Sequence, residues 1–96
     1  MDEQQLKRHL RLGEFRWTPS AEQDVTASGQ SPADFLERHI RGDWGQVSAD
    51  EQLQNEEAIS SGGRLRSIYK TLLGAEVWII TEADRSRTTL TSAEEG

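Results

Sequence analysis

The sequence predicts a single small α+β domain with an N-terminal strand, two to three short helices and then a C-terminal antiparallel β-meander. Three observations predict this class. The 96 residues suffice for one hydrophobic core but not for two. Strand-like alternation occurs at 12–17 and returns only near the start of the last third, and residues with helix-capping chemistry open the stretches between. Strands on either side of a block of helices favour a sheet with the helices on one face.

The domain boundaries follow from composition. Leu6 and Leu10 stand at helical spacing among polar residues, so 1–11 is either an N-terminal extension or a short helix. We assign 12–91 to the α+β domain. We expect the polar end, 92–96, to be a loose tail.

The domain begins with a strand and then turns helical. Phe15 and Trp17 alternate with charged residues, which is typical of a strand at 12–17. Thr18 followed by proline is a helix start, and Gly29 ends that short helix.

Two further helix starts follow. Ser31, again followed by proline, opens an amphipathic helix that ends at Gly42. Ser48 and Glu51 match a capping box and open a polar helix that ends at Gly62. Its apolar anchors are expected to be Leu53, Ala58 and Ile59.

The last third alternates as a meander does. One face of the first strand of the meander would carry Leu65, Ser67 and Tyr69, and its other face would carry Arg64, Arg66, Ile68 and Lys70. A turn at 72–75 leads into the apolar run 77–80, which predicts a central strand covered on both faces. A second turn at 84–87 leads into a short strand at 88–91.

Composition excludes several classes of protein. The net charge of -6 argues against wrapping of nucleic acid by the whole surface, although 64–87 holds five basic residues against three acidic ones. The absence of cysteine excludes disulfides and thiolate metal sites. No stretch is long and apolar enough for a membrane span, so a cytoplasmic protein is expected.

Two polar stretches are candidate binding sites. In the loop at 42–45, the aspartate is expected to bond backbone amides, and the tryptophan either fills the core or stacks on a ligand. The turn after the apolar run is either a hydrogen-bonded turn or a site. The predicted binding residues are Asp43, Trp44, Glu82, Asp84, Arg85, Ser86, Thr88 and Thr89. Because Arg85 and Arg87 are expected to neutralise Glu82 and Asp84, we expect neither metal nor cofactor.

One catalytic constellation is the alternative. A metal-independent ribonuclease needs a proton-transfer group and cations around the scissile phosphate. The candidates are His39, Arg64, Arg66 and Arg85. If His39 is not catalytic, we expect it to be a core histidine whose ring nitrogens are hydrogen-bonded within the protein. The order of helices and meander also resembles the fold of the RelE and barnase-type endoribonucleases.

A second resemblance rests on longer motifs. These are Arg38-His39 with Gly42-Asp43-Trp44-Gly45, Asn55, Gly63-Arg64 with Ser67 and Tyr69, and WIITEADRS at 78–86 followed by Thr88 and Thr89. Together they resemble a family of small bacterial proteins of plasmids, phages and integrated elements, usually labelled plasmid-related and in some cases type I restriction modification subunit. The resemblance implies a mobile-element context and brings no activity with it.

Two functions therefore remain open. The favoured one is a non-enzymatic binding module for a host or defence protein, or for a small nucleotide-like ligand. The alternative is the endoribonuclease, for which RNA would be the substrate. The low hydrophobic content also leaves room for a homodimer that buries Trp17 or Trp44.

Overall fold

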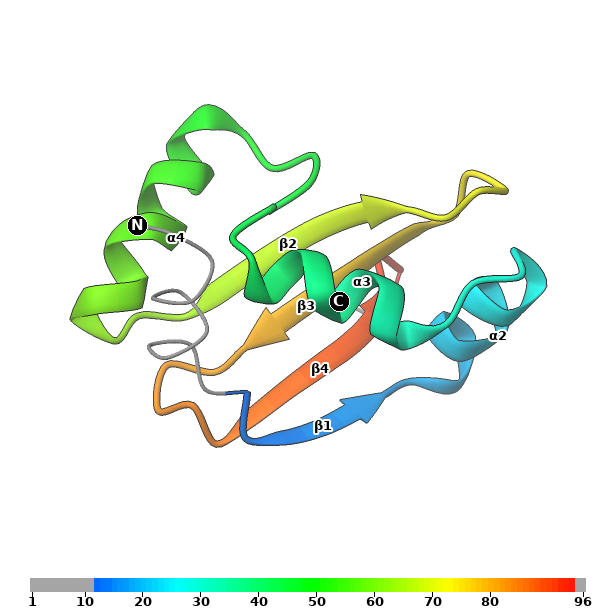
Figure 1. Cartoon of the computed structure of the whole chain (residues 1–96), viewed down its shortest axis with the longest axis horizontal. Helices are drawn as coiled ribbons and strands as arrows, with labels where there is room; N and C mark the ends of the chain where they lie inside the picture. Colours follow the sequence, from blue (N-terminus) through cyan, green and yellow to red (C-terminus); the bar gives the residue numbers. More distant parts are fainter. Residues whose placement is uncertain (1–11, 95–96) are drawn as a thin grey trace.

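The computed structural model describes residues 12–94 and shows the predicted α+β architecture. The elements in this range are β1 (Glu14–Trp17), α2 (Pro19–Ala27), α3 (Pro32–Ile40), α4 (Ala49–Ser61), β2 (Leu65–Lys70), β3 (Glu76–Thr81) and β4 (Arg87–Ser92). In Figure 1, α3 lies in front of the sheet, α2 lies at the right beyond the end of β1, and α4 lies beside β2. The helix predicted within 1–11 lies outside the described residues, as do the last two residues of the predicted tail.

The four strands form one mixed sheet in the order β1-β4-β3-β2. The antiparallel meander of β2, β3 and β4 is confirmed, with Ser67 opposite Ile79 and Ile79 opposite Leu90. β1 is parallel to β4, with Phe15 opposite Thr88. The first strand of the domain therefore pairs with the last strand, which joins the two ends of the domain in one sheet.

The helices begin where their capping residues predicted. Thr18 Oγ1 accepts a hydrogen bond from the Ala21 N–H at 3.3 Å, and Ser48 Oγ accepts one from the Glu51 N–H at 3.1 Å. Ser31 takes part in a capping box at the start of α3. Gly62 ends α4 with a φ of +87°. None of the helices in 12–94 has the length and apolar content needed to cross a bilayer.

The core lies between the helices and one face of the sheet, which we call the inner sheet face. Its main cluster consists of Ala21, Val25, Phe35, Tyr69, Val77, Ile79 and Leu90. A second cluster of Trp44, Ala58 and Leu65 lies beneath α4. The prediction that Leu53 anchors α4 was wrong, since its side chain is 60% exposed and the helix instead buries Asn55.

The opposite face, which we call the outer sheet face, carries the side chains that alternate with the inner ones. These are Glu14 and Arg16 of β1, Arg66, Ile68 and Lys70 of β2, Glu76, Trp78 and Ile80 of β3, and Arg87, Thr89 and Thr91 of β4. Among the described residues, no helix lies over this face (Figure 1). The prediction that 77–80 is covered on both faces was therefore wrong, and Trp78 remains half-buried although Ile80 is buried.

Candidate functional site

The loop at 42–45 is built into the edge of the sheet. Gly45 pairs with Ile68 of β2, and a side chain at Gly45 would place its Cβ 1.9 Å from the Ile68 carbonyl oxygen. Asp43 accepts a hydrogen bond from the Gly45 N–H at 3.1 Å, as predicted, and pairs with Arg38 at 2.7 Å. This hydrogen bond from Arg38 lowers the pKa of Asp43. The loop therefore covers the free edge of β2.

Burial removes two of the predicted binding residues from the surface. Trp44 is 3% exposed and its ring meets the His39 ring edge-on, with centroids 5.5 Å apart. Trp44 thus fills the core, and the prediction that it stacks on a ligand was wrong. Thr88 has no exposed surface because it faces the helices from β4.

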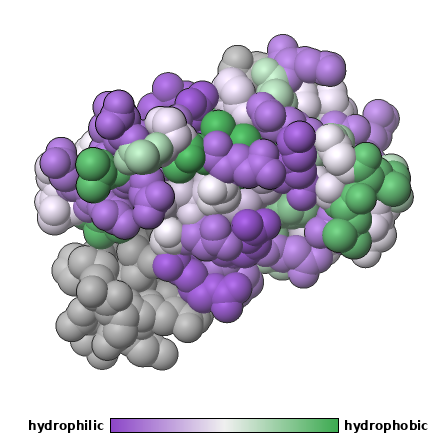
Figure 2. Space-filling model, turned by 90° about the horizontal axis from the view of Figure 1, so that it is seen from above, coloured by the Kyte–Doolittle hydropathy of each residue, from purple (hydrophilic) through white to green (hydrophobic). Residues whose placement is uncertain are grey.

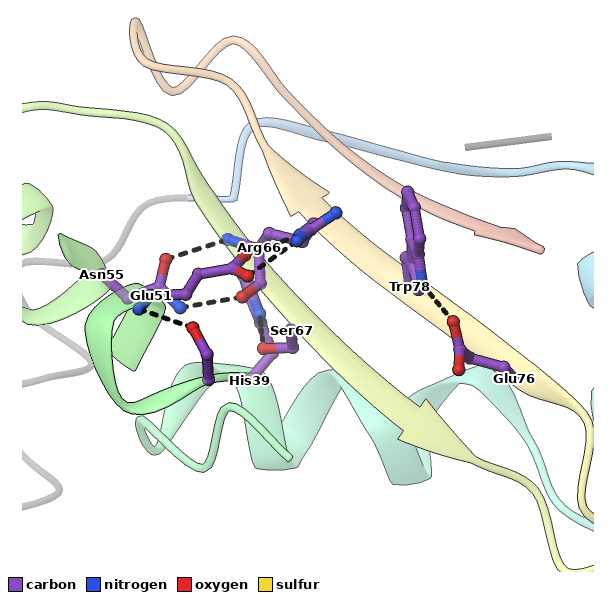
Figure 3. A network of polar contacts seen from close by, with 8 residues as sticks. His39, Glu51, Asn55, Arg66, Ser67, Glu76 and Trp78 are labelled. Atoms are coloured by element: carbon purple, nitrogen blue, oxygen red, sulfur yellow. Dashed lines mark hydrogen bonds and ion pairs between the residues drawn. The ribbon is translucent and has the colours of Figure 1, made fainter. Parts of the chain in front are cut away.

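His39 is fully buried between α3 and the sheet. Its Nδ1 lies 2.6 Å from Ser67 Oγ, and its Nε2 lies 2.9 Å from Thr81 Oγ1. Figure 3 marks the contact of His39 with Ser67. Thr81 Oγ1 lies 2.9 Å from Thr88 Oγ1, and Thr88 donates to the Leu12 carbonyl at 2.7 Å. One chain of hydrogen bonds thus joins α3, three strands and the start of the domain.

The hydroxyl protons of this chain determine the tautomer of His39. Each hydroxyl donates once, so Thr88, which donates to a carbonyl, accepts from Thr81. Thr81 must then accept from Nε2–H of His39, and Ser67 donates to Nδ1. Burial, and secondly the charge of Arg85, lower the pKa of His39 from 6.5 to about 3. A neutral histidine without exposed surface is not placed to exchange protons with a ligand.

Arg85 ties the β3–β4 turn to the end of α4. Its guanidinium donates to the carbonyls of Ala58 and Gly63 at 2.8 and 2.6 Å. A cation is favourable there because the last carbonyls of a helix carry partial negative charge. The prediction that Arg85 neutralises Glu82 and Asp84 was therefore wrong, since its guanidinium bonds backbone instead.

The fold does not bring the four candidate catalytic residues to one site, although Arg64 and Arg66 line the same groove. His39 lies on the inner side of the sheet, whereas Arg66 lies on the outer side and pairs with Glu51. Arg85 is bonded to the end of α4, and Arg64 is exposed. Within 12–94, no group of three His, Cys, Asp or Glu residues is placed to hold a metal ion.

The outer sheet face differs in charge from the rest of the domain. It carries four cations and two carboxylates, whereas the other described residues carry four cations and twelve carboxylates. A net positive face on an acidic domain attracts anionic groups to that face and repels them elsewhere.

A groove of about 560 Å³ lies between α4 and this face. Its lining residues are Ser48, Asp50, Glu51, Gln54, Asn55, Arg64, Arg66 and Trp78. The Arg66 guanidinium pairs with both carboxylate oxygens of Glu51 at 2.6 Å and lies over the Trp78 ring, 4.6 Å from its centroid. Figure 3 shows this arrangement, with the Trp78 indole donating to Glu76 at 2.9 Å. A rigid aromatic and guanidinium stack thus forms one wall of the groove.

Asn55 fixes this wall to α4. Its side-chain amide donates to the Arg66 carbonyl at 2.8 Å and its oxygen accepts from the Arg66 N–H at 3.1 Å. Sequence reasoning missed Asn55, Glu51 and Trp78 as site residues. The signal for Trp78 was its position between Val77 and Ile79, which predicts the opposite face of the strand.

Arg64 is the predicted cation that the described structure leaves unpaired. It lies at the rim of the groove just before β2, and its guanidinium has no hydrogen-bond or ion-pair partner within 12–94. An exposed, unpaired arginine next to an aromatic wall is available to a ligand.

No family model, curated protein or solved structure matches this chain. The resemblance to mobile-element proteins therefore stays a prediction. Its motif residues divide into two groups in the structure. Most hold the fold together, as His39, Asn55 and Arg85 do, whereas Arg64 and Trp78 face the groove.

Proposed function

We propose that this protein is a non-enzymatic binding module of a mobile element that binds a nucleotide-like ligand at the outer sheet face. The ligand is a free nucleotide or a nucleotide of a single strand, which share a planar base and a phosphate. The observation that carries the proposal is the Trp78 and Arg66 stack, which opens onto a groove beside the net positive outer sheet face. The mobile-element context rests on the sequence motifs.

The groove offers separate contacts for base and phosphate. A planar base can extend the stack of Arg66 on Trp78, because bases stack on guanidinium planes and aromatic rings alike. The unpaired guanidinium of Arg64 can pair with phosphate oxygens. The groove volume is also within the range of roughly 300 to 1,000 Å³ usual for small-molecule sites.

The geometry favours binding over the endoribonuclease alternative. General acid or base catalysis needs a titrating group within hydrogen-bond reach of the substrate. His39 is sealed on the other side of the sheet and stays neutral at pH 7, because burial holds its pKa near 3. The carboxylate of Glu51 in the groove is held by Arg66. A binding role uses the groups that are accessible.

The test compares the variants Arg64→Ala and Arg41→Ala, which remove one exposed arginine each. Binding of AMP and of a fluorescein-labelled single-stranded oligonucleotide is measured by calorimetry and anisotropy. Arg64→Ala should weaken binding and lower the dependence of log affinity on log salt by about one, as loss of one phosphate contact does. Arg41→Ala, on the helix side of the domain, should match the wild type.

Three outcomes would overturn the proposal. The first is equal affinity of the two variants, which would place any binding elsewhere. The second is cleavage of a labelled RNA, which would support the endoribonuclease instead. The third is the absence of binding by the wild type to both probes, which would direct the search to an acidic protein partner.

A further inference from the structure

We propose that two copies of this protein pair through β1 in antiparallel orientation, so that their sheets join into one continuous sheet. The inference is independent of the ligand proposed above, because β1 lies at the far rim of the sheet from the groove beside α4 and β2.

β1 is the uncovered edge of the described sheet. The strand order places β1 and β2 at the two rims. The rim at β2 is covered by the loop residues that bridge to Ile68, with Ile68 N–H donating to Trp44 and Gln46 N–H donating to Ile68. At the rim of β1, no described element lies across the strand (Figure 1). An uncovered strand edge is a template for pairing with another chain.

The backbone of β1 presents its free hydrogen-bonding groups at this edge. The N–H groups of Glu14 and Thr18 donate toward β4, to Ser86 and Leu90, each at 3.0 Å. Since backbone groups alternate in direction along a strand, the N–H and C=O groups of Phe15 and Trp17 point away from β4.

An exposed aromatic side chain accompanies these backbone groups. Four large apolar side chains are exposed in the described chain, and Trp17, at 47%, is the one in a strand at an open edge. The others are Leu53 on α4 and the two leucines of the β2–β3 turn. The surface seen in Figure 2 is mostly hydrophilic, with the largest group of apolar residues at one end and smaller ones elsewhere.

The sequence of β1 is complementary to itself in one register. A two-fold axis through Phe15 places Glu14 opposite the partner's Arg16 and Arg16 opposite the partner's Glu14, on the outer sheet face. Directly opposed charges of opposite sign stabilise antiparallel strand pairs. The same register sets Trp17 opposite the partner's Gly13, which carries no side chain.

Neighbouring registers lose this complementarity. A two-fold axis through Trp17 would place Phe15 opposite the partner's Pro19, which has no N–H to donate. A slip by one residue would turn the side chains of one copy to the wrong face. The pairing centred on Phe15 is therefore the one that satisfies both backbone and side chains.

Charge reversal tests the register directly. Glu14 and Arg16 are exposed and, among the described residues, their side chains pair with each other at 2.8 Å, so their variants should fold normally, which circular dichroism checks. Analytical ultracentrifugation over a wide concentration range should show a reversible dimer of the wild type. Glu14→Arg and Arg16→Glu should each weaken dimerisation about tenfold or more, because each places two like-charged pairs across the interface. Glu56→Arg on α4 is the control for Glu14→Arg, because it makes the same change in net charge.

Two restorations distinguish this interface from a general effect of charge. The double variant Glu14→Arg/Arg16→Glu should dimerise as the wild type does, since each charge again faces its opposite. An equimolar mixture of the two single variants should form heterodimers. A wild type that stays monomeric at every concentration, or single variants that dimerise unchanged, would overturn the proposal. So would failure of both restorations.

Discussion

Replacement of His39 with glutamine should change how the stability of this protein depends on pH. His39 is buried and neutral, and burial holds its pKa at about 3 instead of the usual 6.5. Above pH 6.5 neither the folded nor the unfolded state binds a proton at this histidine. Below that pH the unfolded state binds one and the folded state does not, so the wild type loses stability as the pH falls toward 3.

The size of the effect follows from the two pKa values. Each pH unit between them lowers the free energy of unfolding by about 1.4 kcal/mol. Between about pH 7.5 and about pH 4.5 the histidine should therefore cost the wild type about 3 kcal/mol of stability. His39→Gln has no such titration. At the upper pH it should be the less stable protein because the bonds to Ser67 and Thr81 are perturbed, and this deficit should shrink by about 3 kcal/mol at the lower pH.

Urea unfolding at a series of pH values measures this difference, and the carboxylates that titrate in both proteins cancel from it. Parallel pH profiles of wild type and His39→Gln would refute the reasoning, because they would mean that His39 titrates equally in the folded and unfolded states. NMR of the wild-type protein is a second test. The chemical shifts of the His39 ring nitrogens should not titrate over the same pH range.

Substitutions of Arg85 and Gly45, each with a comparison variant, test the contacts that position the turns. Arg85→Ala should lower the free energy of unfolding by about 1 to 3 kcal/mol, because the carbonyls of Ala58 and Gly63 each lose a charged donor. Arg85→Gly should be less harmful by about 1 kcal/mol, since φ is +61° there, and equal midpoints for wild type and both variants in urea would refute this role. Gly45→Ala should lower the free energy of unfolding by several kcal/mol, because the new Cβ would clash with the Ile68 carbonyl. Gly74→Ala has open space around it and should lower the free energy of unfolding by about 1 kcal/mol. Similar thermal midpoints of the two variants would contradict this difference.

Features of the fold that depend on residues close together in the sequence could be predicted from the sequence. Thr18, Ser31 and Ser48 cap helices through bonds to groups about three residues away, so their pattern carries the information. The alternation in β2 likewise predicted which side chains face the core, since strand side chains alternate whatever the strand pairs with.

Features that depend on distant residues were not predictable from the pattern. The parallel pairing of β1 with β4 joins segments at opposite ends of the domain. The exposure of Trp78 was missed for a similar reason, whereas the burial of Trp44 was one of its two predicted alternatives. The helices pack on the inner side of the sheet or beside β2, which buries Trp44 in the core and leaves Trp78 at the open face. Arg85 was expected to meet nearby carboxylates, but the end of α4 lies within its reach.

The most direct test of the proposed binding site is an NMR titration of the full chain with a short single-stranded oligonucleotide, observed at the three indole N–H groups. Trp78 reports on the groove, Trp44 on the core and Trp17 on the edge of β1. We predict that the Trp78 signal shifts saturably while the Trp44 signal stays in place. An unchanged Trp78 signal under conditions where the oligonucleotide is bound would contradict the account.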